Sequence, residues 1–453
     1  MIRRRPKGSR ITDPAEYTPH FSRRRATGEG HPHVRDLYCE GVSLERVAKA
    51  VGTPAYVYSK RSIEDAYREL DGAFGLLRHR LCYALKANAN FSILRILAKL
   101  GSSFDIVSGG ELERLRRISV AGGRIVFSGV GKTREEIRNG IRYRAGRSKQ
   151  RGILLFNVES EAELEILIEE AERHVKSGGE RVPAAIRVNP DILAGGHPHI
   201  STGYHHHKFG MEWREALRLY QKHKDSPWIA WRGISAHIGS QILALGPFRR
   251  AGGRLASYVR ELAAKGIHLA YLDIGGGLGI RYTDETPTDP ALYARELAKI
   301  VRPLGCELLL EPGRALAGPA GVLLTRVLYV KESRGKKFVI VDAAMNDLIR
   351  PSLYGARHAI TRVTTETREP APTDRVDVVG PVCESGDFLA RDWPLSEVRT
   401  GDLLVVWATG AYGFVQSSNY NARLRPAEVL VDGKRFRVIR RRQHFADLVR
   451  GEL

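Results

Sequence analysis

Long apolar segments are absent from this sequence of 453 residues. A helix needs about 20 consecutive apolar residues to cross a bilayer, and no run approaches that length. The first residues, MIRRRPK, carry positive charges but lack the apolar stretch that follows such charges in a secretory signal. These absences argue against a membrane protein and predict a protein that stays in the cytoplasm.

Cysteine is also scarce. Only Cys39, Cys82, Cys306 and Cys383 occur, and no two of them have the C-x-x-C spacing. So few cysteines in so long a chain indicate neither a disulfide framework nor a zinc site. A cysteine that takes part in chemistry would therefore act as a free thiol.

Acidic residues are outnumbered, with 51 Asp and Glu against 72 Lys and Arg, which gives a formal charge of +21. Basic clusters lie at Arg3–Arg5, Arg23–Arg25, Arg142–Arg151 and Arg440–Arg442. They raise nucleic-acid binding as an alternative, but no nucleic-acid motif surrounds them, which favours a solvated basic surface that attracts small anions. Residues 1–32, rich in Arg, Pro, Gly and Ser, predict a flexible extension.

From about residue 81 to 311, short β-rich runs alternate with helical patterns, at a length that suits two domains. The eight runs are 82–86, 104–107, 124–128, 152–156, 184–188, 233–237, 270–274 and 307–311. Helices are expected near 91–100, 109–121, 133–141, 160–176, 212–223, 247–265 and 289–303, with Ser108, Thr133 and Ser160 as N-caps. This order predicts an α/β fold with a (β/α)8 barrel, and a doubly wound open sheet is the alternative.

After residue 312 the pattern changes to strands joined by turns. The runs are 322–330, 337–342, 375–379, 402–407, 427–431 and 435–439. We expect the barrel to span 59–312 and a mostly β domain to span 313–453. Residues 33–58 should pack with that domain, since Ala55–Tyr58 also resembles a strand.

Polar residues follow the barrel runs at equivalent points, where the loops of a (β/α)8 barrel converge over one mouth. They are Lys86, Asp105 with Ser108, Ser128, Asn157, Arg187 with Asn189, His237, and Glu311 with Arg314. Each has an ordinary alternative, such as a helix cap, a turn or a lysine extending from a strand end. Their common location predicts an active site at the mouth.

The seventh run leads into Asp273-Ile-Gly-Gly-Gly-Leu-Gly279. Glycines let backbone N–H groups approach an anion, and barrels often hold phosphate after strands seven and eight; a plain flexible turn is the alternative. A lysine amine, a phosphate cradle and a carboxylate together indicate pyridoxal 5'-phosphate bound to Lys86 as a Schiff base. Glu311 would face the pyridine nitrogen, and Asp105 is expected beside the cofactor.

Beyond these positions, the sequence resembles the fold type III pyridoxal-phosphate decarboxylases, and within them the diaminopimelate decarboxylases. The likeness extends from about Gly41 to Leu430. It rests on YALKAN, FDIVSGGEL, FSGVGKT, FNVES, HISTG, KFG, HIGSQI, DIGGGLG, EPGR, VDAAMNDLIRPSLYGA, GPVCESGDFLA, GAYGF and NYNARLRPAEVL.

The resemblance implies a role for each matching residue. Lys86 would be the Schiff-base lysine, His237 would stack on the cofactor ring, and Glu311 would pair with the ring nitrogen. The phosphate would be surrounded by Ser240, Gly275, Gly276, Gly277 and Tyr412. The substrate would be held by Arg314, Arg350, Tyr354, Glu384 and Tyr412, with Cys383 returning a proton to the reacting carbon.

The resemblance also implies a homodimer with shared active sites, because Cys383 and Glu384 match a pair that the neighbouring subunit contributes. The expected reaction is decarboxylation of meso-diaminopimelate to L-lysine. Two arginines and Glu384 can satisfy both the carboxylate and the amine at the far end of this substrate.

Three alternatives stay open at this point. One is a decarboxylase for lysine, ornithine or carboxynorspermidine, although lysine and ornithine would leave an arginine unmatched. Another is a catalytically dead regulatory homologue, which should have lost Lys86, Cys383 or the glycines. The third is a nucleic-acid-binding protein built on a barrel. The run His205–His207 is not expected to bind metal, since adjacent loop residues point in different directions.

Overall fold

The computed structural model describes residues 12–25, 34–146, 152–192, 208–366 and 373–453. The chain divides into two compact units. The barrel unit comprises Ile63–Ile280 and Pro287–Leu316. The β unit comprises the residues up to Ser62, the short segment Arg281–Thr286, and the residues from Ala317 onward. Within the described ranges, no helix is both long and apolar enough to cross a membrane.

Eight parallel strands close the barrel unit into a ring, as predicted, so the open-sheet alternative is wrong. In ring order the strands are β5 (His79–Ala84), β6 (Ser103–Ile106), β7 (Ile125–Phe127), β8 (Leu155–Val158), β9 (Val182–Arg187), β10 (Ile229–Ser235), β11 (Tyr271–Asp273) and β12 (Glu307–Leu310). Parallel strands direct all their carboxyl ends to one rim, where active sites of such barrels lie.

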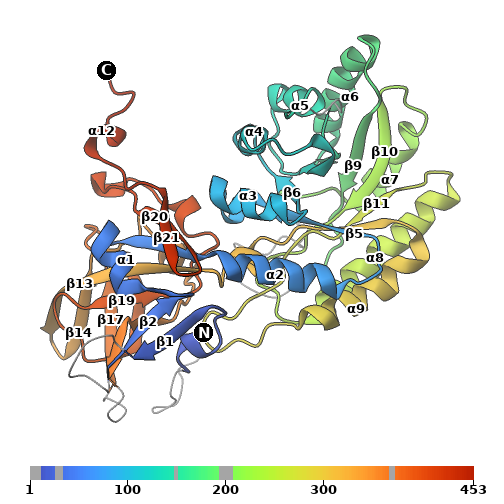
Figure 1. Ribbon diagram of the computed structural model, residues 1–453. Coiled ribbons are helices and arrows are strands. Elements are labelled where there is room, and N and C mark those ends of the chain that lie inside the picture. Colours follow the sequence, from blue (N-terminus) through green and yellow to red (C-terminus); the bar gives the residue numbers. More distant parts are fainter. Residues whose placement is uncertain (1–11, 26–33, 147–151, 193–207, 367–372) are drawn as a thin grey trace. The chain divides into compact units, whose positions relative to one another are not determined.

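Helices lie outside the ring of strands (Figure 1). They are α2 (Lys60–Ala73), α3 (Phe91–Lys99), α4 (Gly109–Arg117), α5 (Arg134–Ile141), α6 (Glu161–Lys176), α7 (Trp213–Lys222), α8 (Leu245–Ala264) and α9 (Pro290–Val301). The three predicted N-caps are confirmed, since Ser108, Thr133 and Ser160 each accept a hydrogen bond from the backbone three residues later. Such caps satisfy N–H groups that the first helical turn leaves unpaired.

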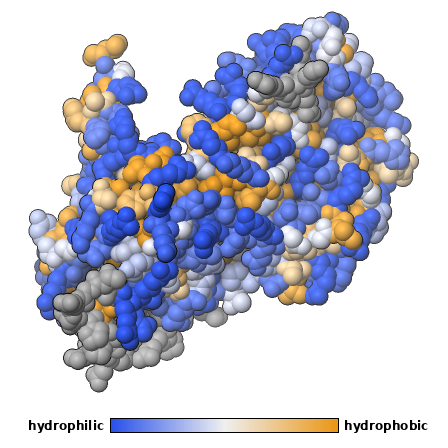
Figure 2. Space-filling view, viewed as in Figure 1, coloured by the Kyte–Doolittle hydropathy of each residue, from blue (hydrophilic) through white to orange (hydrophobic). Residues whose placement is uncertain are grey.

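The outer helices are amphipathic. In α6, Leu164, Leu167 and Ala171 share one buried face. The intervening positions are mostly Glu, Arg and Lys. On the face of the molecule drawn in Figure 2, hydrophilic colours predominate and the hydrophobic ones form smaller patches.

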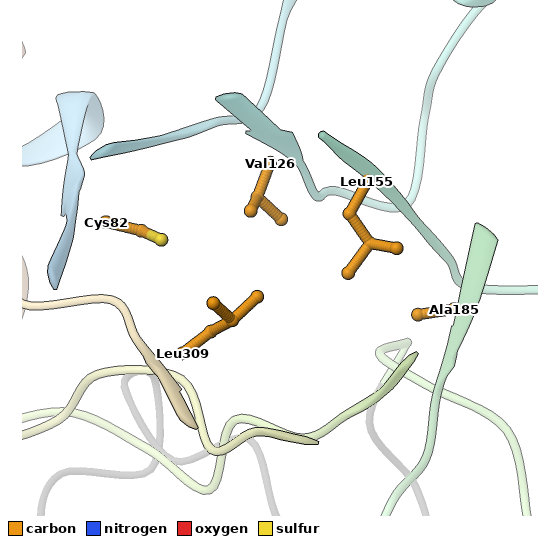
Figure 3. Close-up of a cluster of buried hydrophobic side chains, with 5 residues drawn as sticks. All are labelled: Cys82, Val126, Leu155, Ala185 and Leu309. Atoms are coloured by element: carbon orange, nitrogen blue, oxygen red, sulfur yellow. The ribbon is translucent and has the colours of Figure 1, made fainter. Parts of the chain in front are cut away.

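The interior of the barrel is filled by apolar side chains. Cys82, Val126, Leu155, Ala185 and Leu309 come from five different strands and point toward one another (Figure 3). All five are fully buried. The barrel is therefore a packed core, which leaves the rim as the place for chemistry.

The β unit is built on a nine-stranded sheet with an interior strand, β4 (Ala55–Ser59), that precedes the barrel in sequence. β4 pairs with β13 and β20. The other strands of this sheet are β13 (Gly321–Ser333), β14 (Lys336–Val341), β15 (Ile360–Arg362), β17 (Thr373–Val379), β18 (Phe388–Ser396), β19 (Leu403–Val406), β20 (Ala427–Asp432) and β21 (Arg435–Arg440). A smaller sheet contains β1 (Phe21–Arg25), β2 (Val34–Cys39), β3 (Val42–Ser43) and β16 (Thr364–Glu366).

The expected flexible extension is wrong for residues 12–25. β1 pairs antiparallel with β2, and the buried Phe21 contacts Trp407 at 5.6 Å between ring centroids. Arg23 donates to the carbonyl of Val363 at 3.0 Å and forms an ion pair with Asp13. The contacts of Phe21 and Arg23 order residues 12–25, although the composition of this segment resembles that of a linker. The rest of 1–32 lies outside the described residues.

Arginines of the last basic cluster bond to other residues of the β unit. Arg440 pairs with the buried Glu428, Arg441 pairs with Asp447, and Arg442 donates to the carbonyl of Pro54 at 2.7 Å. These guanidinium groups bond within their own unit, which weakens the nucleic-acid alternative. Arg3–Arg5 and residues 147–151 lie outside the described part of the chain.

Replacing Leu309 by Ala should destabilise the barrel by about 2 to 4 kcal/mol, because a cavity would remain in a close-packed interior. Urea unfolding followed by circular dichroism measures the change. The matched control is Leu292→Ala on α9, where the leucine is 41% exposed and little should change. An equal loss of unfolding free energy in both variants would contradict a packed interior.

Candidate active site

Lys86 lies at the carboxyl rim of the barrel, but not at the end of a strand as the sequence predicted. β5 ends at Ala84, and Lys86 sits in a single 3-10 turn, η2 (Leu85–Ala87). Its Nζ donates to Oδ2 of Asp105 on β6 at 2.9 Å. The lysine side chain is 35% exposed and the aspartate is buried. An amine is thus held at the rim with a carboxylate behind it.

A second set of polar side chains joins four strand ends. Ser128 donates to Oε1 of Glu311 at 3.3 Å. Asn157 donates through Nδ2 to Ser128 at 3.1 Å and to Oδ2 of Asp273 at 3.0 Å. Gly275 N–H donates to Oδ1 of Asp273 at 2.9 Å. The network therefore fixes the ends of β7, β8, β11 and β12 relative to one another.

Glu311 and Asp273 are two buried carboxyl groups whose pKa values are both raised. Burial raises the pKa of Glu311 well above its usual value, and the charges of Asp105 and Asp273 add to the effect. Burial also raises the pKa of Asp273, to about 6, against the opposing hydrogen bonds from Gly275 and Asn157. A carboxyl group that holds a proton near neutral pH can give it to a basic ligand nitrogen and then pair with the cation formed.

His237, which follows β10, presents a neutral ring. Its Nδ1 accepts the N–H of Gly276 at 3.0 Å, so this nitrogen carries no proton. Burial lowers the pKa of His237 well below its usual value, and the positive charges of Lys86 and Arg187 lower it further. A neutral, oriented imidazole is suited to contact with a flat aromatic ligand.

The glycine loop is shaped by close packing as well as by any ligand. A Cβ on Gly276 would lie 2.2 Å from the carbonyl oxygen of Glu311, and one on Gly277 would lie 2.5 Å from that of Gly239. Gly277 also has a φ of +107°, which other residues rarely adopt. The N–H groups of Gly275 and Gly276 donate to Asp273 and His237, respectively. The N–H of Gly277 makes no hydrogen bond within the described residues. Of the three glycine N–H groups, it is therefore the one available to contact an anion.

Ser240 and Arg314 are also brought together in the barrel unit. Nη2 of Arg314 donates to Oγ of Ser240 at 2.9 Å. Arg314 begins the short helix α10 (Arg314–Ala317) directly after the turn that follows Glu311. Both expected ligand-binding side chains thus follow strand ends of the same rim.

Two buried ion pairs that the sequence reasoning missed support this rim. Glu159 bonds Nη1 of Arg187 at 2.7 Å and accepts the N–H groups of Gly129 and Gly210 at 3.2 and 2.9 Å. This one carboxylate therefore connects three loops. Its position directly after the FNV of FNVES, at a strand end, was the available signal.

Lys132 forms the other pair. Its buried Nζ donates to Glu163 at 2.7 Å and to the carbonyls of Gly129 and Asn157 at 2.7 and 2.8 Å. Lys132 thereby fixes the backbone that carries the Asn157 amide. Glu111 was missed as well, and burial raises the pKa of its carboxyl to about 7.

In the β unit, Arg350 and Tyr354 lie on α11 (Arg350–Tyr354). Arg350 is only 5% exposed, and its Nη1 bonds the hydroxyl of Tyr282 at 2.6 Å and Nε2 of His358 at 3.3 Å. Among the described residues no carboxylate pairs with it. The hydroxyl of Tyr354 accepts a hydrogen bond from Gln416 at 3.2 Å.

Tyr412 lies in a tightly held loop of the β unit. Thr409 and Gly410 donate to the carbonyls of Gly321 and Gly318 at 2.8 and 3.1 Å. Tyr412 itself has a φ of +57°, an unfavourable conformation for a residue with a side chain. Such strain is often found at functional positions.

Cys383 and Glu384 are exposed on a turn of the β unit that is held from beneath. Asp387 accepts the N–H groups of Met345 and Val382, each at 2.7 Å. The N–H of Cys383 donates to Asn421 at 2.9 Å. A rigid backbone thus presents a thiol and a carboxylate to solvent.

The expected site residues fall into two groups. The barrel unit brings together Lys86, Asp105, His237, Ser240, Gly275, Gly276, Gly277, Glu311 and Arg314. The β unit carries Arg350, Tyr354, Cys383, Glu384 and Tyr412. His205–His207 and HISTG lie outside the described residues; in the ranges that are described, no three His, Cys, Asp or Glu side chains could hold a metal ion.

The residues of the barrel rim fit the expected pyridoxal phosphate. An amine that can react with an aldehyde lies on the same rim as two carboxyl groups with raised pKa values and a neutral imidazole. Three buried polar atoms of the barrel unit, Oδ1 of Asp105, Oδ1 of Asn157 and Oγ of Ser235, have no hydrogen-bond partner among the described residues. Unsatisfied buried polar atoms are rare in a protein interior, and a polar ligand would account for them.

Comparison with known proteins agrees with this chemistry. A family model described as the pyridoxal binding domain of pyridoxal-dependent decarboxylases matches residues 60–318. A diaminopimelate decarboxylase of Pseudomonas aeruginosa is 47% identical over 417 residues, which cover 92% of this chain and 97% of that protein.

Two solved structures are also similar. Diaminopimelate decarboxylase from Helicobacter pylori complexed with L-lysine is 39% identical, with a TM-score of 0.83, over 90% of this chain and 98% of that one. The enzyme of the same name from M. jannaschii in complex with L-lysine is 35% identical, with a TM-score of 0.83, over 92% and 96%.

Replacing Asp273 by Asn should change how stability depends on pH. An aspartate has a pKa near 3.9 when unfolded, and the folded value is about 6, so the folded wild type binds more protons between these values. Its free energy of unfolding then falls as pH rises from about 4 to 6, by about 2 to 3 kcal/mol from this group. The variant should lack this fall.

Urea unfolding of cofactor-free protein between pH 4.5 and 7 measures the difference between wild type and variant. The exposed Asp225, changed to Asn, serves as the control and should show no such trend. A difference that stays constant with pH would contradict the raised pKa of Asp273.

Proposed function

The chain belongs to the pyridoxal-dependent decarboxylases, and from this premise we propose that it is the lyase that decarboxylates meso-2,6-diaminopimelate to L-lysine and carbon dioxide. This is the last step of lysine biosynthesis by the diaminopimelate pathway. Relatives of this name match almost the whole chain, including the β unit. Decarboxylation of lysine, ornithine or carboxynorspermidine is not favoured by these matches. A catalytically dead homologue is not favoured either, because the chain keeps Lys86, Cys383 and the glycines.

Pyridoxal phosphate, when bound, supplies an aldehyde that joins the substrate amine and a protonated ring that accepts the electron pair left by departing carbon dioxide. Lys86 would hold the aldehyde, and Asp105 balances the charge of its amine. Glu311 would keep a proton at the ring nitrogen, and His237 would lie against the ring. The N–H of Gly277, with Ser240 and Tyr412, would bind the phosphate.

The observation that carries the choice of substrate is the buried guanidinium of Arg350. A buried charge without a counter-charge is unfavourable by several kcal/mol, and none of the described carboxylates supplies one. The distal carboxylate of meso-diaminopimelate would complete the pair, and we propose that Arg314 and Tyr354 bind the same end of the substrate. Lysine and ornithine carry only an amine at that end.

Purified enzyme should turn over meso-diaminopimelate with a kcat/KM at least about 10^3-fold above that for L-lysine or L-ornithine, because a site built for a carboxylate rejects an analogue that lacks it. Released carbon dioxide is measured for each substrate. Lys86→Ala is the control and should lower kcat by about 10^3-fold or more, since the covalent step is lost. A preference for L-lysine would overturn the proposed function.

We further propose a homodimer in which Cys383 and Glu384 complete the active site of the partner subunit. Both side chains face solvent on a rigid turn, which suits residues that act elsewhere. Large apolar side chains are exposed on the same unit, including Leu353 at 50% and Tyr420 at 45%, and Tyr420 bonds Glu384. Cys383 would then return the proton to the reacting carbon.

Mixing Lys86→Ala with Cys383→Ala should restore activity that neither variant has alone. After subunit exchange, half of the dimers are mixed and each has one intact site, so about a quarter of wild-type activity is expected. Lys86→Ala mixed with Glu311→Ala is the control and should stay inactive, because both changes lie in the barrel unit. Mixed dimers without activity would place Cys383 in the site of its own chain.

We also propose that the enzyme acts in the cytoplasm. All four cysteines are free, and a reducing compartment keeps thiols in that state.

A further inference from the structure

The guanidinium of Arg350 is held by two side chains whose contribution to the reaction is not assigned above. Tyr282 lies in the short segment Arg281–Thr286 of the β unit, and His358 follows α11 by four residues. We propose that His358, assisted by Tyr282, is a positioning residue that aims Arg350 at the distal carboxylate of the substrate and so determines specificity. This inference rests on the proposed function.

His358 is fixed in one protonation state by its two contacts. Its Nδ1 lies 2.7 Å from the carbonyl oxygen of Trp407, and a carbonyl only accepts, so Nδ1 carries the proton. Its Nε2 lies 3.3 Å from Nη1 of Arg350, and a guanidinium only donates, so Nε2 must accept. The neutral ring with its proton on Nδ1 satisfies both contacts.

The position of the ring is fixed by the sheet. His358 is fully buried, and the next residue, Ala359, accepts the N–H of Trp407 at 2.9 Å. The chain then enters β15, which pairs with β19 through Ile360 and Val406. The imidazole is therefore anchored to the sheet, while the arginine it contacts lies at the start of α11.

Tyr282 fixes the other degrees of freedom of the guanidinium. The phenol accepts a hydrogen bond from the same Nη1 at 2.6 Å, and the carbon Cζ of Arg350 lies 4.8 Å from the centre of the tyrosine ring. The rings of Tyr282 and His358 meet edge to face at 4.9 Å and 76°. Nη1 of Arg350 is thus bonded by both Tyr282 and His358, and the tyrosine ring covers one face of the guanidinium.

Both acceptors are neutral, and both use the same nitrogen of Arg350. The full positive charge and the donors on Nη2 and Nε therefore stay available for a ligand carboxylate, which a guanidinium binds in a fork. An acidic residue in place of His358 would position the arginine equally well but would neutralise it. Tyr282 and His358 thus orient the guanidinium of Arg350 without neutralising its charge.

The test compares two substitutions of His358 in the full holoenzyme. In His358→Asn the amide nitrogen takes the place of Nδ1, so the bond to Trp407 is kept and the acceptor for Arg350 is lost. In His358→Gln the longer amide places an oxygen near the position of Nε2, so the acceptor is kept. KM and kcat for meso-diaminopimelate are measured, with the inhibition constant of L-lysine, which has no distal carboxylate.

His358→Asn should raise KM for meso-diaminopimelate at least about tenfold, and the inhibition constant of L-lysine should change less than about twofold. His358→Gln should stay within about threefold of wild type in both. Tyr282→Phe, which removes only the hydroxyl acceptor, should shift KM in the same selective way and replaces His358→Asn should that variant fail to fold.

Trp393→Phe is the matched control. It removes a buried hydrogen bond to the carbonyl of Ile360 at 2.8 Å in the same sheet without touching Arg350, so KM should not change. Equal effects of the Asn and Gln variants, or equal effects on substrate and L-lysine, would overturn the positioning role. A wild-type enzyme inactive on meso-diaminopimelate would instead overturn the proposed function.

Discussion

The rim of the barrel depends on the compensation of carboxylates that are buried close together. Removing a charged group from water is unfavourable by several kcal/mol unless an opposite charge or hydrogen-bond donors replace the water. Asp105 has the amine of Lys86, and Glu159 has Arg187 and two backbone N–H groups. Because each partner comes from a different strand end or loop, satisfying the charges also fixes the loops to one another.

Asp273 and Glu311 use a different solution. Burial raises the pKa of each, and the negative charge of Asp105 raises both further, so these carboxyl groups keep a proton to a higher pH than usual. Asn157 orients this pair with its amide, and Lys132 holds the backbone of Asn157. The rim therefore contains one carboxylate, Asp105, paired with the amine of Lys86 and, on the neighbouring strands β11 and β12, two carboxyl groups with raised pKa values.

Two buried arginines differ in whether their partners are charged. Arg187 is paired with Glu159 and serves the structure of the rim. Arg350 is equally buried, but its contacts are a phenol and an imidazole, both neutral. Its charge is therefore reserved for a ligand. Whether a buried arginine is structural or functional is decided here by the charge of its partners, not by its burial or its place on an element.

The sequence by itself determined the order of strands and helices, the caps that begin the helices, and the polar residues at the strand ends. These features depend on local periodicity and on bonds between residues a few positions apart, so neighbouring letters are enough to reveal them. The motifs quoted from Lys86 to Tyr412 also indicated the family.

Only the tertiary structure decided which of these polar groups compensate one another. The partners of Glu159 lie up to 51 positions away, and Tyr282 is 68 positions from Arg350. The same holds for Phe21, which orders a basic segment by contacting Trp407. Long-range pairing leaves no periodic trace in the chain, because the physical reason for it, shared burial, exists only after the fold has formed.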